Sequence, residues 1–149
     1  MSLKIVYFLS LLFVALAMTP AFAHLLELPH KITLSGTDYL VVQQVYRGWA
    51  LVGIVVIAAL LSTLALSVMT RRDPHAFWPS LVAFLAILGT QIVFWTFTFP
   101  VNRTTSNWTV LTSDWEVLRR QWEFSHATSA LLNFVALIAM IISVLRWKD

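Results

Sequence analysis

Four long apolar blocks divide this chain, and each has about the length needed to cross a lipid bilayer. They cover about residues 3–28, 49–69, 78–99 and 126–145. A bilayer's hydrocarbon core is spanned by roughly 20 helical residues. It holds no water to satisfy free backbone N–H and C=O groups, so such segments must be helical. The sequence therefore predicts an all-α protein, a single membrane domain over residues 1–149 that crosses the bilayer four times.

The charge content agrees with this class. Only 11% of the residues are charged and 59% are hydrophobic, whereas a soluble domain carries about 25% charged residues. The chain has no cysteine, which excludes disulfide and thiolate chemistry. Its basic residues are scattered rather than clustered, so we expect no nucleic-acid partner. The expected surroundings are a lipid bilayer.

Short connections between consecutive spans predict an up-down-up-down bundle. Lys and Arg are equally frequent in the two sets of connections, so their number does not decide the orientation. The connection between the second and third spans is short and contains Arg71 and Arg72. Short basic connections tend to lie in the cytoplasm, so we expect this connection and both termini there. We therefore expect a multi-pass protein of the inner membrane. The first and third connections would form a partly helical cap on the outer side.

The first block also resembles a secretory signal, with Lys4 before an apolar core and Ala21-Phe22-Ala23 as a cleavage-like site. Cleavage would make His24 the N-terminus, which can chelate copper through its amine and ring. The apolar run continues to Leu28, and this length favours an uncleaved span. Pro29 is expected to end this helix, because the residue before a proline avoids the α conformation. Pro100 is likewise expected to end the third span.

Helices are also expected within the connections. Thr37 is the predicted N-cap of a helix in the first connection. In the third connection, Ser113 and Glu116 form a capping-box pattern that predicts a helix start near Ser113. One face of this second helix is apolar and is expected to act as an interfacial anchor: Trp115, Leu118 and Trp122.

Candidate catalytic groups gather where the first span ends and the fourth begins. His24 and Glu27 are three residues apart and share a helical face. Chain order in an up-down bundle puts them on the same side of the membrane as His126. Unpaired polar groups near hydrocarbon are costly, so we expect the three side chains to converge. Histidine and glutamate placed in this way can accept and donate protons.

The same region offers a possible metal site. His24, His30 and His126 would suit a single iron, copper or zinc ion. No close-spaced ligand motif such as His-Glu-x-x-His is present, so a site that needs no metal is equally open. A further alternative is a structural cluster in which Glu27 pairs with Lys31 or an arginine and closes the end of the bundle.

Polar residues also continue along the third and fourth spans at helical spacing. A polar group in hydrocarbon needs a partner, so these residues should face inward. They would either line a binding pocket or bond one helix to another. The residues predicted to bind a substrate are Gln44, Gln91, Trp95, Asn102, Arg103, Trp122 and Asn133.

Four segments together resemble the anthrone-oxygenase-like family of small four-helix membrane proteins. They are His-Leu-Leu-Glu-Leu-Pro-His-Lys from His24, Asp-Tyr-Leu-Val-Val-Gln-Gln-Val-Tyr-Arg-Gly-Trp from Asp38, Phe-Pro-Val-Asn-Arg from Phe99, and Trp-Glu-Val-Leu-Arg-Arg-Gln-Trp-Glu-Phe-Ser-His from Trp115. The resemblance covers nearly the whole chain, and its first segment is similar to the mostly uncharacterised bacterial branch. The positions that match the family are Pro100-Val101-Asn102, Arg119, Trp122 and His126.

The resemblance implies oxidation of a lipophilic aromatic molecule with dioxygen, since a few fungal and actinobacterial relatives convert polycyclic anthrones to anthraquinones. An acidic C–H would lose its proton to His126 or to the His24–Glu27 pair. Arg103 or Arg119 would stabilise the resulting oxyanion. The alternative is a non-catalytic membrane binding module or accessory subunit whose polar end is structural. The sequence leaves the oligomeric state open.

Overall fold

The structure is a computed structural model that describes residues 2–147. This part of the chain is helical and contains no strand, and four of its helical stretches are long and apolar enough to cross a membrane. The all-α prediction is therefore confirmed. The elements are α1 (Leu3–Lys31), α2 (Gly36–Gln43), the 3-10 turns η1 (Gln44–Tyr46) and η2 (Trp49–Leu51), α3 (Val52–Thr70), α4 (Pro74–Val93), the π-helical η3 (Phe94–Thr98), α5 (Phe99–Thr104) and α6 (Trp115–Arg146).

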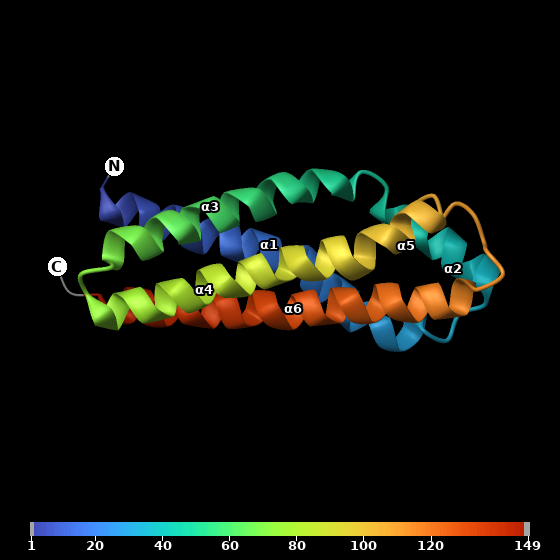
Figure 1. Cartoon of the computed structure of the whole chain (residues 1–149). Coiled ribbons are helices and arrows are strands. Elements are labelled where there is room, and N and C mark those ends of the chain that lie inside the picture. Colours follow the sequence, from blue (N-terminus) through green and yellow to red (C-terminus); the bar gives the residue numbers. More distant parts are fainter. Residues whose placement is uncertain (1, 148–149) are drawn as a thin grey trace.

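The four long helices lie lengthwise against one another (Figure 1). Helices α1 and α4 each pack against both α3 and α6. The start of α1, the end of α6 and the α3–α4 connection lie at one end of the molecule, and α2, α5 and the loop before α6 lie at the other. We call residues 32–51 and 105–114 the cap.

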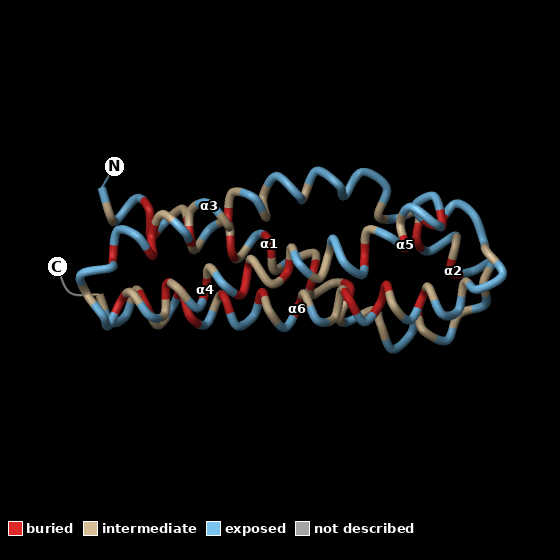
Figure 2. Tube along the Cα trace, in the orientation of Figure 1, coloured by how far each residue is buried: buried red, intermediate tan, exposed pale blue. Residues whose placement is uncertain are grey.

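Buried and exposed residues alternate along the long helices (Figure 2). The exposed ones include many large apolar residues, and the buried ones are mostly small or polar. In the most apolar window of each, no more than 33% of the residues are buried. On α1, Phe8 and Leu16 are exposed whereas Ser10 is fully buried. Between α4 and α6, the Oγ atoms of Ser80 and Ser143 are hydrogen-bonded at 2.8 Å. This inverted pattern is typical of helices that pack inside a membrane, where small residues allow close approach and polar groups bond across the interface.

Helix α1 does not end at Pro29, as predicted, but continues to Lys31. A proline inside a helix removes one backbone hydrogen bond, and here that loss does not stop the helix. The extra turn keeps Glu27 and Lys31 four residues apart on one helical face, where their side chains form an ion pair. The tertiary contacts of Lys31, described below, explain why the helix continues.

The third long helix contains the π-helical turn η3 and likewise extends past its predicted end at about residue 99, continuing through Pro100 to Thr104. Pro100 lies in the first turn of α5, where a missing N–H is tolerated. A π turn closes i→i+5 bonds and is wider than an α turn, so it rotates the following residues relative to the preceding ones. The residues of this span that were predicted to face inward therefore do not share one face, because Trp95 is 59% exposed whereas Thr98 is buried.

Helix starts in the cap also differ from the predictions. Ser35, not Thr37, is the N-cap of α2, and its Oγ accepts a hydrogen bond from the backbone N–H of Asp38 at 3.2 Å. The capping box predicted at Ser113 does not form, since the N-cap of α6 is Asp114 and makes no side-chain capping bond.

The helix predicted in the third connection and the fourth predicted span, residues 126–145, form one continuous helix, α6. It is one helix of 32 residues. Its predicted apolar face of Trp115, Leu118 and Trp122 packs into a second apolar cluster with Tyr39 and Trp108 of the cap. The cap therefore rests on the first three turns of α6.

Gly48 provides a test of the backbone of the cap. It joins η1 to η2 with a φ of 90°, and a Cβ there would meet no atom within 4 Å. Gly48→Ala should therefore destabilise the protein by about 1 kcal/mol through backbone strain alone. In the matched control Gly53→Ala, a helical glycine with equally open space, stability should rise by roughly 0.5–1 kcal/mol. Unfolding of both variants in detergent measures this, and equal effects would contradict the left-handed turn.

Candidate functional site

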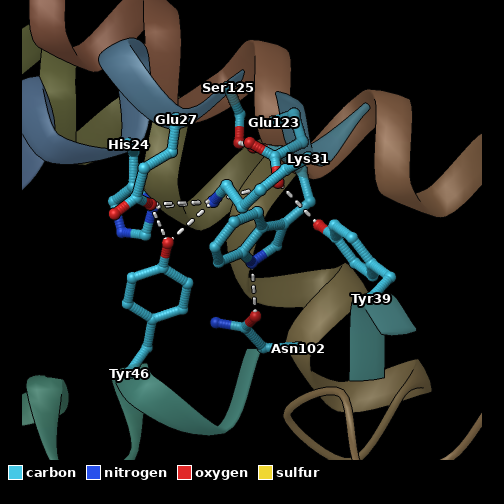
Figure 3. A network of polar contacts seen from close by, with 9 residues as sticks. His24, Glu27, Lys31, Tyr39, Tyr46, Asn102, Glu123 and Ser125 are labelled. Carbon is cyan, nitrogen blue, oxygen red and sulfur yellow. Dashed lines mark hydrogen bonds and ion pairs between the residues drawn. The ribbon is translucent and has the colours of Figure 1, made fainter. Parts of the chain in front are cut away.

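The site is organised around Lys31, the last residue of α1, which is 3% exposed. Its Nζ lies 3.1 Å from Glu123 Oε1 and 3.4 Å from Glu27 Oε2. It also donates a hydrogen bond to Tyr46 Oη at 2.9 Å and lies 3.4 Å from His24 Nδ1 (Figure 3). An ammonium group has three N–H donors and no acceptor, so these four neighbours can only accept from it, and they share its three N–H groups.

Glu123, from α6, is fully buried in the network, with no exposed surface. Its Oε1 accepts a hydrogen bond from Tyr39 Oη at 2.8 Å, while Oε2 has no partner within residues 2–147. A buried carboxylate is tolerated only when a cation and hydrogen-bond donors face it. Lys31 and Tyr39 supply both.

Tyr46, which belongs to the cap, contacts both Lys31 and Glu27. Its hydroxyl donates to Glu27, and its ring faces Lys31 Nζ at 4.7 Å from the centroid. Burial raises the pKa of the Tyr46 phenol above its ordinary value, and the hydrogen bond to Glu27 raises it further. Burial, followed by the nearby Glu123 carboxylate, also raises the pKa of Tyr39. Both phenols therefore keep their protons and remain donors at ordinary pH.

His24 and His126 lie next to this network, with ring centroids 4.1 Å apart and planes inclined by 33°. The Trp122 ring is 4.1 Å from His126 and 5.0 Å from His24. Because Lys31 bridges His24 and Glu27, the three side chains predicted to converge do lie together. His24 and Glu27 come from the last third of α1 and His126 from the first half of α6, and these two helices pack side by side.

Two cavities meet at the histidines. The inner cavity has a volume of about 210 Å³ and lies among the four long helices, walled by small residues such as Ala17, Ala21 and Gly53. The cap cavity has a volume of about 430 Å³ and lies under the cap. His24 and His126 line both cavities. The imidazole pair therefore stands between an apolar space inside the helices and a more polar space at their capped end.

Five of the seven residues predicted to bind a substrate line these cavities. Gln91 and Asn133 line the inner cavity. Gln44, Asn102 and Trp122 line the cap cavity, where the Trp122 indole N–H donates to Asn102 Oδ1 at 2.8 Å.

Other predicted residues do not line either cavity. Trp95 is turned outward by η3, and Arg103 is exposed in the last turn of α5. Arg119 is buried, but it donates to the Leu34 carbonyl at 2.6 Å instead of facing a cavity. Glu123, four residues further along α6, pairs with Lys31 instead. Glu27 is held by Lys31 and Tyr46 at the edge of the network.

The predicted metal ligands do not form one set. His30 is exposed, away from the paired rings of His24 and His126. His24 Nδ1 faces the Lys31 ammonium, and a cation already occupies the place where a metal ion would bind that nitrogen. Across residues 2–147 there is no group of three or more histidine, aspartate or glutamate side chains arranged for a metal ion. The residues present do not fit the predicted ion.

The pairing of Glu27 with Lys31, one of the alternatives predicted from the sequence, is present in the structure. The other members of the network were not predicted: Tyr39, Tyr46 and Glu123. One signal was available. His24 and Glu27 are spaced i,i+3, and Glu123 and His126 repeat that spacing in reverse order on the facing helix. Such a mirrored pair indicates two carboxylates close together in the fold, and a buried carboxylate such as Glu123 is stabilised by a nearby cation.

Comparisons of the chain with protein-family models, with curated proteins and with solved structures found no match. The function must therefore be argued from the geometry of this site and from the resemblance of the motifs that build it.

Lys31 should be the most sensitive position in the network. Lys31→Met keeps the length of the stem but leaves Glu123 buried without a cation, which should destabilise the protein by about 3–5 kcal/mol. Adding Glu123→Gln should recover much of the loss, because the amide needs no cation. Arg103→Met, which removes an exposed cation from the same end, should change stability by less than about 0.5 kcal/mol. Unfolding in detergent measures all three, and equal effects of the Lys31 and Arg103 substitutions would contradict the buried network.

Proposed function

We propose that this chain is a multi-pass membrane protein that oxidises a small lipophilic aromatic molecule with dioxygen, as anthrone oxygenases do. One observation supports this above all others: the inner cavity lies among four helices of membrane-spanning length and has two imidazole rings in its wall. A molecule dissolved in the bilayer would reach such a cavity without passing through water. The motif resemblance points to the same class of reaction.

The size and lining of the inner cavity suit this substrate class. An engineered apolar cavity of about 150 Å³ binds benzene, so about 210 Å³ can hold a larger ring system. Most of the wall is aliphatic or aromatic, and Gln91 and Asn133 are its amide groups. Amides at the deep end would orient the ring, while the reacting carbon would face the histidines.

The reaction proposed is the conversion of an activated ring methylene and dioxygen into a ring carbonyl and water. It begins when a base removes a proton from the methylene carbon. The two histidines are the basic side chains in the wall of the inner cavity. The carbanion left behind is conjugated with the ring system and is electron-rich enough to react with dioxygen. His126 is the base in this proposal.

A specific observation favours a second candidate, a non-catalytic membrane binding module or accessory subunit. The charged groups near the histidines bond mainly to one another, and Lys31 has four acceptors from the protein itself. A network satisfied in this way would also serve to fix the cap on the long helices. In that case the cavities would hold a ligand without changing it.

Oxygen consumption by the purified protein distinguishes the two. With anthrone as the probe, the unsubstituted protein should consume dioxygen and form anthraquinone. His126→Ala should reduce the rate about 100-fold or more by removing the base. His75→Ala, at an exposed histidine of the opposite end, should leave it unchanged. A lipophilic molecule that co-purifies with a protein inactive on anthrone and similar aromatics would favour the binding module.

The orientation proposed has both termini and the α3–α4 connection in the cytoplasm, and the cap outside it. The support is the basic pair Arg71 and Arg72 in that short connection. Reporter fusions after Thr70 and at the C-terminus should both give cytoplasmic signals. A periplasmic signal from either fusion would contradict this orientation.

A further inference from the structure

The two histidines lie side by side but are held differently. His24 Nδ1 lies 3.4 Å from Lys31 Nζ, which is buried and can only donate. His24 Nδ1 must therefore carry the lone pair of the ring. A neutral imidazole has one lone-pair nitrogen and one N–H, so the proton of His24 is on Nε2.

A doubly protonated His24 ring is incompatible with this contact. Its Nδ1–H would point at an ammonium group 3.4 Å away in a site that excludes most water. Two positive charges at that separation repel strongly when little solvent screens them. The contact with Lys31 therefore fixes both the charge of His24 and the identity of its protonated nitrogen.

His126 has no comparable partner. No hydrogen bond holds it within residues 2–147, and its Nε2 is enclosed without a partner. Its neighbours are the rings of His24 and Trp122, which pack against it and do not accept its proton. Whichever nitrogen of a neutral His126 carries the hydrogen, the other keeps a lone pair that no cation of the protein occupies.

We propose that Lys31 gives the two histidines different roles, so that His24 presents an N–H donor to the inner cavity and His126 keeps the lone pair that accepts a proton. Lys31 is a positioning residue in this scheme, because it acts through His24. The catalytic part rests on the proposed function, whereas the protonated nitrogen of His24 does not.

In this scheme His24 is the group that stabilises the oxyanion, a role that the sequence analysis gave to Arg103 or Arg119. Loss of a proton from a carbon conjugated with a carbonyl places negative charge on the carbonyl oxygen. Arg103 and Arg119 line neither cavity, whereas His24 lines the inner one. An N–H from a neutral imidazole stabilises such an oxygen without competing for the substrate proton.

Nitrogen NMR of histidine-labelled protein at neutral pH tests the first part directly. His24 should show a pyrrole-type Nε2 and a pyridine-type Nδ1, and its signals are assigned as those lost in His24→Gln. The exposed His30 and His75 provide reference signals in the same spectrum. A proton on His24 Nδ1, or a fully protonated His24 ring, would overturn the proposal in the unsubstituted protein itself.

Variants of Lys31 then test its part in this arrangement. Lys31→Arg keeps an N–H donor and should preserve the His24 signals. Lys31→Met combined with Glu123→Gln removes both charges together, which protects the fold, and should give signals averaged between the two neutral forms. Unchanged signals in the folded double variant would show that Lys31 does not position His24.

Glutamine substitutions separate the two roles in the oxidation assay. A glutamine amide can donate a hydrogen bond but cannot act as a base at neutral pH. His24→Gln should therefore keep activity within about 10-fold, whereas His126→Gln should lose about 100-fold or more. The opposite order would overturn the assignment. Failure of the unsubstituted protein to oxidise any probe would count against the proposed function alone, because the NMR result decides the His24 arrangement separately.

Discussion

The contact between Lys31 and Glu123 is the interaction on which the capped end depends. Both side chains are almost fully buried, and neither would be stable there alone. Their ion pair fixes the end of α1 against α6. Tyr39 of α2 and Tyr46 of η1 then complete the hydrogen bonds of the pair, which ties the cap to both helices. The cap is thus positioned by polar contacts in addition to its apolar cluster.

The same contact links structure to chemistry. The cation that compensates two carboxylates also faces His24 Nδ1. The group that stabilises the fold is therefore also the one that sets the hydrogen bonding of a cavity-lining histidine. The neighbouring rings of Trp122 and Tyr46 also pack against the imidazoles.

The long helices were predictable because the constraint that shapes them is local. An apolar run of membrane-spanning length has to be helical wherever it occurs. The approach of His24 to His126 also followed from chain order and helical spacing. The errors at Pro29 and Pro100 have a different cause, since a local rule about proline was overruled by contacts distant in sequence. The outward position of Trp95 depends on a single π turn, which the periodicity of the sequence does not predict.

The depth of the histidines in a bilayer follows from the lengths of α1 and α6. His126 stands twenty residues before Arg146, the last residue of α6, and His24 stands twenty-one residues after Leu3, the first residue of α1. At about 1.5 Å per helical residue, both distances are close to the roughly 30 Å thickness of the hydrocarbon layer. With the far ends of these helices at one surface, the two rings lie at the other, on the boundary between oil and water. The oxidation proposed for this site would, at this depth, draw both its substrate and its dioxygen from the lipid and release its water to the aqueous side.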